Sequence, residues 1–453
     1  MKIKHITIRN NPILWNIDLD FVKSDWSVSD TVLFVGENGS WKSTLLNIIY
    51  NFCNFEDPQL TGRESRTFVV ELSHPELWKW EYTITMDLNI KNTNRVNSWL
   101  NNVEIYKWKQ RIQTPDFVRS EELRKYMIWV FLDTSINFNT QTINSVTNLD
   151  TDANIERSMR TWWNTAQNTK QLFVDIINKD GLDLTNWVDE NDWVVPPEEV
   201  KHIRLNRFKK AFNYMFHDEW LEFAGSDWLT PVFKKNWWQK ILIDNLSSWE
   251  KQIAYRWWFL LKDRNSLSDS IILIDEPEIS MHPLWQEKIL DFYKNLFKYE
   301  EQTIVSQNFV TTHSPYLLQS IDNEEDYVFI FPWWERVDNI RKYLWVVPSL
   351  WIINYRAFNL PTIELFNELY WYIWAKANVK SEWELERYLV ANGFTKDKQR
   401  PDRWSLKDCT LWTFIRNKIH HPEIEAARSL NYTPIEFKES IDWMIEFIER
   451  NSL

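Results

Sequence analysis

The chain has 453 residues, a formal net charge of −12 and two cysteines. This length allows two or three domains with sizeable cores. Because the balance is acidic, any nucleic-acid partner must be bound by a local basic patch. Two cysteines exclude a disulfide framework, and no apolar run approaches the roughly 18 residues of a membrane span. A strand pattern starts at once, with no signal peptide ahead of it, so we expect a soluble cytoplasmic protein with no membrane association.

Tryptophan and glycine occur in unusual proportion, with 30 Trp and only 6 Gly. At ordinary usage of about 7%, a chain of this length would carry roughly 32 glycines. Trp also stands where turns usually need glycine, as in Trp237-Trp238 and Trp333-Trp334. We hypothesise that most Trp residues stand for Gly, as when a UGA codon is read as glycine in one bacterial lineage and as tryptophan in another. The alternative is a truly Trp-rich protein, which UGG codons at 41 and 249 would establish.

The N-terminal part predicts strands around one helix. Strands are expected over 2–9 and 17–21, and residues 32–35 are an apolar run typical of a buried strand, ahead of a helix over 45–50. Three later segments alternate with period two and predict an antiparallel subdomain: 68–72, 82–86 and 103–106.

The remaining chain alternates between helical and α/β patterns. Helical spacing over 155–179 and 201–216 predicts a mainly helical insert. The continuous apolar run 271–274 is typical of a parallel strand covered on both faces. Further strands are expected at 309–312 and 327–331, and helices return near the C-terminus. These patterns divide the chain into four predicted parts: 1–110, 111–235, 236–350 and 351–453.

A phosphate-binding loop is predicted after the strand at 32–35. Residues 36–44 match the pattern G-x-x-x-x-G-K-[ST], except that Trp41 replaces the second glycine. The backbone of such a loop passes around a phosphate, and an indole there leaves no room for it. Lys42 would reach the β- and γ-phosphates and Ser43 would coordinate Mg²⁺; a chance match is disfavoured by the flanking strand and helix. The predicted nucleotide-binding residues are Gly36, Glu37, Asn38, Gly39, Ser40, Trp41, Lys42, Ser43 and Thr44.

Two carboxylates follow the buried run 271–274. Asp275 is expected to hold Mg²⁺, and Glu276 to polarise the water that attacks the γ-phosphate. The alternative is an acidic strand end that caps the next helix. The phosphate loop upstream favours the catalytic interpretation.

A third motif spans Leu246 to Gln252. Read with glycine in place of Trp249, it resembles the L-S-x-G-E/Q signature of ATP-binding-cassette ATPases. The predicted contacts to nucleotide come from Ser247, Ser248, Trp249 and Glu250. His313 follows the strand at 309–312, where that superfamily keeps its switch histidine; a lone histidine at a strand end is otherwise usually structural.

The order of phosphate loop, signature, Asp-Glu pair and histidine resembles the cassette ATPase superfamily. It is most similar to the soluble branch of structural-maintenance-of-chromosomes (SMC) and overcoming-lysogenisation-defect ATPases, many of them in phage defence. The stretch before the signature is too long for a compact transporter cassette, and residues 276–286 resemble this branch's E-P-E-x-x-L-H-P-x-W-Q run, which makes Trp285 a true tryptophan. The resemblance implies a head-to-tail homodimer that sandwiches two ATP molecules, each between one phosphate loop and the partner's signature. Gln59 and Gln141 are candidates for a glutamine loop.

A last motif lies near the C-terminus. Arg416-Asn417-x-x-x-His421 resembles the R-N-x-x-x-H motif of HEPN domains, which are often metal-independent ribonucleases. Arginine can stabilise phosphorane charge while histidine moves protons. On an ideal helix, however, Arg416 shares a face with His420 rather than His421. The alternative is a polar helix end in a docking domain.

The sequence thus predicts an α/β P-loop cassette ATPase head with an antiparallel β subdomain, a helical insert and a helical C-terminal domain. Its predicted function is Mg²⁺-dependent ATP hydrolysis that opens and closes a dimer and gates an effector, with the C-terminal domain acting on RNA in phage defence. One rival is a DNA-maintenance ATPase whose C-terminal domain only mediates contacts. The other is a non-hydrolysing interaction module, which a chain with literal Trp41 and Trp249 would be.

Overall fold

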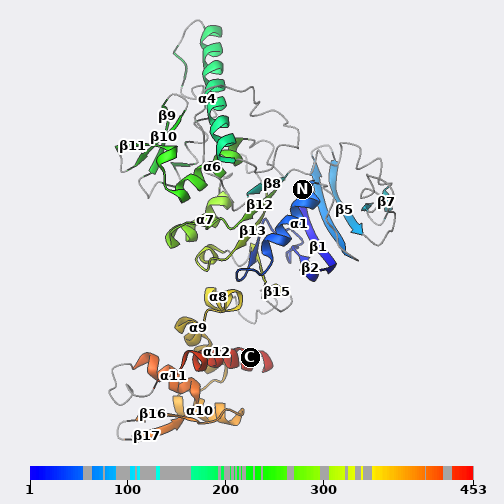
Figure 1. The fold of residues 1–453 in the computed structure, drawn as a ribbon. Helices are drawn as coiled ribbons and strands as arrows, with labels where there is room; N and C mark the ends of the chain where they lie inside the picture. The colour runs from blue at the N-terminus through cyan, green and yellow to red at the C-terminus, as the bar shows by residue number, and fades with distance from the viewer. Residues whose placement is uncertain are drawn as a thin grey trace. The chain divides into compact units, whose positions relative to one another are not determined.

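The computed structural model divides the chain into two compact units, residues 1–338 and 339–453 (Figure 1). The structure describes residues 1–54, 64–74, 77–87, 103–107, 110–112, 129–132, 165–191, 195–197, 205, 209, 212–213, 216, 221–227, 230–235, 238–262, 270–295, 306–321, 325–331, 338–339, 349–402, 405–421 and 431–451.

A largely parallel sheet is the centre of the first unit, with strand order β15-β14-β3-β13-β12-β8. Its strands are β3 (Thr31–Val35), β8 (Trp129–Leu132), β12 (Ile271–Asp275), β13 (Gln307–Thr312), β14 (Asp326–Ile330) and β15 (Asp338–Asn339). The pairs β14–β3, β3–β13, β13–β12 and β12–β8 are all parallel. The carboxyl ends of β3, β13 and β12 therefore meet at one edge, and the predicted α/β class is confirmed.

Strand β8 was not predicted. It lies in the stretch 111–235, which we expected to be a mainly helical insert, yet it pairs with β12 from Ile271↔Trp129 to Ile274↔Leu132. A four-residue apolar segment carries no periodicity that separates a strand from a helix. Its strand conformation comes from the distant partner β12.

The predicted antiparallel subdomain is present as a second sheet, with order β2-β1-β4-β5-β6-β7. Its strands are β1 (Lys2–Asn11), β2 (Trp15–Asp20), β4 (Ser65–His74), β5 (Leu77–Asp87), β6 (Val103–Lys107) and β7 (Gln110–Ile112). Gln307 at the start of β13 is fully buried and joins the two sheets. Its side chain accepts from the Ile3 N–H at 2.7 Å and donates to the Ile3 and Ser29 carbonyls.

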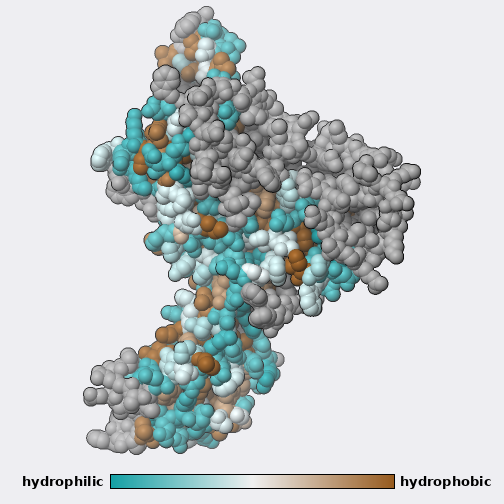
Figure 2. Space-filling view, in the orientation of Figure 1, coloured by the Kyte–Doolittle hydropathy of each residue, from teal (hydrophilic) through white to brown (hydrophobic). Residues whose placement is uncertain are grey.

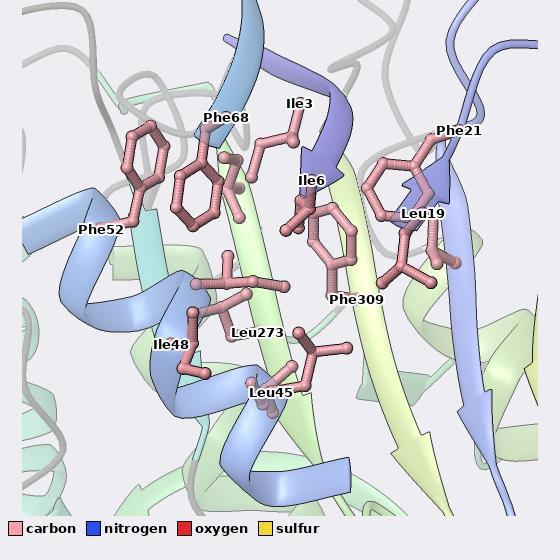
Figure 3. Close-up of a cluster of buried hydrophobic side chains, with 14 of the residues drawn as sticks. Ile3, Ile6, Leu19, Phe21, Leu45, Ile48, Phe52, Phe68, Leu273 and Phe309 are labelled. Atoms are coloured by element: carbon pink, nitrogen blue, oxygen red, sulfur yellow. The ribbon is translucent and has the colours of Figure 1, made fainter. Parts of the chain in front are cut away.

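Helix α1 (Lys42–Asn54) covers the parallel sheet directly after the phosphate loop. Figure 3 shows Leu45, Ile48 and Phe52 pointing from α1 into a cluster with strand residues such as Leu273. The Phe52 ring stacks on Phe68 with centroids 3.8 Å apart. This burial fixes the start of α1, and with it the phosphate loop, against the sheet.

The rest of the first unit combines helices with a small antiparallel sheet. Helix α4 (Thr165–Glu190) agrees with the predicted helix in part, while residues 155–164 and most of 201–216 lie outside the described residues. The prediction of a mainly helical insert is wrong for 221–227 and 230–235, which form β9 and β10. The elements are β9 (Leu221–Asp227), β10 (Thr230–Lys235), β11 (Gln239–Leu242), η4 (Ile243–Asn245), α6 (Ser248–Lys262), α7 (Pro283–Asn295) and η6 (Leu317–Ser320).

The second unit is mainly helical, as predicted, but also contains a two-stranded hairpin. Its elements are α8 (Leu350–Phe358), α9 (Ile363–Lys376), α10 (Glu382–Ala391), β16 (Lys398–Asp402), β17 (Ser405–Cys409), α11 (Leu411–His420) and α12 (Pro434–Arg450). Helix α12 starts with a capping box between Thr433 and Glu436, and Pro434 lies in its first turn. The hairpin β16–β17 was not predicted.

The surface of the described residues mixes hydrophilic and hydrophobic side chains on the face shown in Figure 2. Among those residues, no helix has the length and apolar character that a bilayer span requires.

Candidate active site

The phosphate loop begins where the fully buried strand β3 ends. A Cβ at Gly36 would lie 2.4 Å from the Phe331 carbonyl oxygen, so only glycine fits there. Residues 37–39 are exposed, whereas Ser40 is buried. The loop therefore has a fixed start against the sheet and an outer face open to solvent.

Position 41 has the backbone conformation of a glycine. Trp41 has φ of 66°, and its side chain is 53% exposed. The left-handed conformation costs an L-residue roughly 1–2 kcal/mol. Trp15 and Trp26 share it, with φ of 60° and 69°. The second glycine of the phosphate-loop pattern is thus missing at a position whose backbone favours it.

Lys42 starts helix α1 and turns back into the loop. Its buried Nζ donates to the carbonyls of Gly36 and Glu37 at 3.0 and 2.9 Å and to Ser40 Oγ at 2.9 Å. Burial lowers the pKa of Lys42 to about 8, although the nearby carboxylates, Glu276 first, raise it. The ammonium group is held where a phosphate ligand of this loop would be bound.

Asp275 and Ser43 bring two oxygen ligands together. Asp275 ends the buried strand β12, and its Oδ1 accepts from Ser43 Oγ at 3.0 Å. It also accepts from Thr311 Oγ1 at 2.5 Å. Mg²⁺ is usually bound by few protein oxygens together with substrate phosphates and water. A hydroxyl and a carboxylate in contact fit this ion, so these are the residues that would hold it.

Glu276 and His313 are in direct contact. His313 Nε2 lies 2.8 Å from Glu276 Oε1. The hydrogen bond from His313 holds the pKa of Glu276 below its ordinary value, and the charges of His313 and Lys42 act in the same direction against burial. His313 Nδ1 lies 2.9 Å from the Gly36 carbonyl and 3.2 Å from Lys42 Nζ. An ionised carboxylate and an imidazole thus face the phosphate loop.

The order of the strands explains this convergence. Strand β13, which carries His313, lies between β3 of the phosphate loop and β12 of the Asp-Glu pair. The five predicted residues Lys42, Ser43, Asp275, Glu276 and His313 therefore form one contact network. Thr44 lies in the first turn of α1 and is half-buried. Both glutamine-loop candidates, Gln59 and Gln141, lie outside the described residues.

The signature segment forms the start of helix α6. Glu250 is buried and accepts from the N–H and hydroxyl of Ser247 at 2.8 and 2.6 Å and from Lys235 Nζ at 3.0 Å. Burial raises its pKa, but these donors outweigh burial and lower it. Trp249 is half-buried, with its ring centroid 4.9 Å from that of Trp285. Among the described residues, no hydrogen bond or ion pair joins 246–250 to the phosphate loop of the same chain.

Several residues of the network were missed in the sequence. Thr311 Oγ1 bonds Asp275 and also accepts from the Glu276 N–H at 3.1 Å. Thr312 and the main chain of His313 both donate to the buried Glu278. The available signal was the run Thr-Thr-His at the strand end. Nothing in it specified which carboxylates these residues would bind.

The C-terminal candidates lie in the second unit. Arg416 Nη1 is 3.6 Å from Glu382 Oε2, and His420 Nε2 is 3.2 Å from Asn367 Oδ1. Partial burial, followed by the charges of Arg416 and His421, lowers the pKa of His420. His421 follows the last residue of α11 with φ of −131°. His420 and Arg416 thus lie on the same helix α11, while His421 lies beyond its end.

A parallel sheet with a phosphate loop, a strand-end Asp-Glu pair and a histidine on the strand between them is the arrangement of a P-loop nucleotide-binding fold. The sequence agrees: residues 246–318 match the family model for an AAA ATPase domain. That match runs from the signature to the segment after His313. No curated protein matches the chain.

Solved structures with a similar fold include SMC heads and a transporter cassette. The SMC head domain from Thermotoga maritima is 13% identical, with 73% of this chain and 95% of that chain covered and a TM-score of 0.37. An SMC head bound to the C-terminal winged-helix domain of ScpA is 9% identical, with 73% and 93% covered and a TM-score of 0.39. An ATP-binding cassette of an ABC transporter is 14% identical, with 73% and 88% covered and a TM-score of 0.29. At these identities the similarities concern the fold alone.

Proposed function

We propose that this chain binds ATP with Mg²⁺ and hydrolyses it as a head-to-tail dimer. The observation that carries the proposal is the contact network of Lys42, Ser43, Asp275, Glu276 and His313 at one edge of the sheet. Lys42 would exchange the loop carbonyls for the β- and γ-phosphate oxygens. The start of α1 adds the favourable field of a helix N-terminus.

The residues divide the chemistry among them. Ser43 and Asp275 would hold Mg²⁺, which neutralises charge on the phosphates when bound. Glu276, kept ionised by His313, accepts a proton from the attacking water as the water attacks the γ-phosphorus. His313 stabilises the charge that develops on the phosphoryl oxygens. The products are ADP and inorganic phosphate.

Replacing Glu276 by Gln tests the hydrolytic role. In the chain with glycine at positions 41 and 249, we expect this substitution to lower turnover by about 10²-fold or more, while ATP affinity is retained because the phosphate loop is unchanged. Steady-state phosphate release and equilibrium binding of ATP measure the two quantities. Undiminished turnover in the Gln variant would refute Glu276 as the base.

The signature segment supports the dimer. Ser248 and residue 249 start helix α6, where backbone N–H groups are available to an anion. A partner's γ-phosphate can approach these groups only if residue 249 lacks a bulky side chain. We expect the E276Q variant with glycine at 41 and 249 to be dimeric with ATP and monomeric with ADP in sedimentation velocity. A monomer in both states would exclude the sandwich.

We further propose that residues 41 and 249 are glycine in the working protein. The left-handed backbone at Trp41, Trp15 and Trp26 supports this proposal, because each is a position that glycine occupies without strain. The codons, or the mass of the peptide over 36–44 from the native host, test it directly. UGG codons, or a native peptide that contains Trp41, would refute it.

For the second unit we propose an RNA-directed activity under control of the ATPase cycle, in phage defence. Arg416 and His420 on α11 favour it, because they pair a phosphate-binding guanidinium with a proton-transfer group. His420→Ala should abolish RNA cleavage, whereas His421→Ala should retain it. ATPase activity should be unchanged in both variants. If RNA cleavage or toxicity survives when His420 and His421 are both replaced by Ala, the rival proposal of a contact domain in DNA maintenance is favoured.

A further inference from the structure

Glu278 is a buried carboxyl group beside the catalytic pair. It is 7% exposed, and one oxygen, Oε1, accepts both the Thr312 hydroxyl and the His313 N–H at 2.7 Å. The Thr312 hydroxyl in turn accepts from the Ser314 N–H at 3.0 Å. Glu278 therefore bonds Thr312 and the main chain of His313 directly, and it is linked to Ser314 through the Thr312 hydroxyl.

The other oxygen of Glu278 has a different environment. Oε2 is buried and has no hydrogen-bond partner among the described residues. A buried ionised oxygen without a donor is costly, whereas the neutral acid is less so. Burial also raises the pKa of Glu278, against the donors to Oε1 that lower it. Both hydrogen bonds, from the Thr312 hydroxyl and the His313 N–H, end on Oε1. The side chain therefore acts through one acceptor atom.

The turn between Glu276 and Glu278 is short and well fixed. The Ile279 N–H donates to the Glu276 carbonyl at 3.3 Å, and the Met281 N–H donates to the Glu278 carbonyl at 3.0 Å. Glu276 itself has φ of 41°. Because Glu276 and Glu278 belong to one rigid turn, a bond from Glu278 to the His313 main chain sets the distance between the Glu276 and His313 side chains.

We propose that Glu278 is a positioning residue that holds His313 against Glu276, and that an uncharged side chain of the same shape suffices. This inference rests on the proposed ATPase function. It predicts that Glu278→Gln, which keeps an acceptor in the place of Oε1, retains turnover within about threefold. Glu278→Leu, which removes the acceptor, should lower turnover by 10- to 100-fold, because a small misplacement of catalytic groups has effects of about this size.

The test uses the full chain with glycine at positions 41 and 249. ATP affinity should be unchanged in Glu278→Leu, because the phosphate loop is intact, and the loss should be in kcat. In the His313→Ala background the Leu substitution should cause no further loss, since no histidine is left to position. Thr312→Val, with Thr312→Ser as its matched control, tests the same contact should the Leu variant fail to fold: Val should lower kcat and Ser should not.

Three outcomes would overturn the inference: full kcat in both Glu278→Leu and Thr312→Val, an equal loss in Glu278→Gln and Glu278→Leu, or a further loss in the His313→Ala background. Failure of the ATPase proposal itself is recognised separately. In that case the chain with unaltered Glu278 shows no turnover above that of Glu276→Gln.

Discussion

The phosphate loop and the signature segment each carry a tryptophan where their motifs have glycine. The two tryptophans differ in backbone conformation and in side-chain packing. Trp41 has a left-handed backbone and an exposed side chain. Trp249 lies in the first turn of α6 and packs against Trp285 and Phe216, with centroids 4.9 and 6.2 Å away. The first position needs glycine for its own backbone, and the second shows no such need within one chain.

This difference separates two physical reasons for glycine. At position 41 the reason is conformational, because a side chain strains the φ angle and also fills the space around the phosphate. At 249 the reason, in the proposed dimer, is close approach by a ligand held on another subunit, which a single chain cannot show. Variants at the two positions should therefore change different steps of the ATPase cycle.

The largest expected effect comes from glycine at both positions. W41G alone should restore ATP binding, whereas W249G alone should leave binding weak. The double variant should hydrolyse ATP on the order of 10³-fold faster than the Trp-containing chain, because the loss of one backbone-type donor alone costs about 10² to 10³. Calorimetric titration with ATP and phosphate release under saturating ATP measure the two steps. Normal turnover by the Trp-containing chain would show that neither position needs glycine for ATP hydrolysis.

Much of this site could be predicted from the sequence because its parts follow strands. The apolar runs at 32–35 and 271–274 identify buried parallel strands, and residues just beyond the carboxyl ends of such strands meet. Lys42, Asp275 and His313 are therefore expected to lie together without any distance information. Strand β8 and the role of Glu278 are not predictable in this way, because both depend on pairing with residues far along the chain.

The hairpin β16–β17 and the sheet β9–β11 were missed for a related reason. Strand β17, Ser405–Cys409, has mixed polarity and a Pro-containing partner strand, so neither period dominates. Strands β9 and β10 follow a stretch with helical spacing, and their register, for example Phe233↔Phe223, is set by cross-strand packing. The positive φ at residue 41 was, in contrast, implied by the motif itself.

A second prediction concerns stability. It tests whether the Trp285 side chain contributes more to the free energy of unfolding than the Trp249 side chain does. Trp285 is 4% exposed and contacts Phe216 as well as Trp249. Trp285→Ala should lower the free energy of unfolding by about 3 kcal/mol, the usual size for a buried aromatic. Trp249→Ala should change it by less than about 1 kcal/mol. Urea denaturation followed by circular dichroism measures both, and equal losses would contradict the distinction.

A third prediction concerns the phosphate loop and the pH dependence of ATP binding. Lys42 has a pKa lowered to about 8 in the free protein, and bound phosphates favour its charged form. Below that pH the ammonium is charged before ATP binds. Above it, binding must take up a proton, so the Kd for ATP should rise by up to about tenfold per pH unit. ATP-binding assays from about pH 7 to 9.5, made on the chain with glycine at positions 41 and 249, measure this rise.

The matched control for the pH dependence is Lys42→Met, which has no titratable group at this position. It should bind ATP more weakly at every pH and show no rise above pH 8 beyond that of the nucleotide itself. A parallel rise in both proteins would assign the dependence to another group and would refute the lowered pKa of Lys42.

The smallest expected effect tests the backbone argument where no ligand is involved. Trp26 closes a turn in which its N–H donates to the Lys23 carbonyl at 3.0 Å; its φ is 69° and its side chain is 85% exposed. Trp26→Gly should raise the free energy of unfolding by about 1 kcal/mol relative to Trp26→Ala, because both remove the indole but only glycine removes the Cβ strain. Equal stabilities of the Gly and Ala variants would mean that the left-handed backbone imposes no requirement for glycine. The same explanation for residue 41 would then fail, leaving only the steric argument about the phosphate.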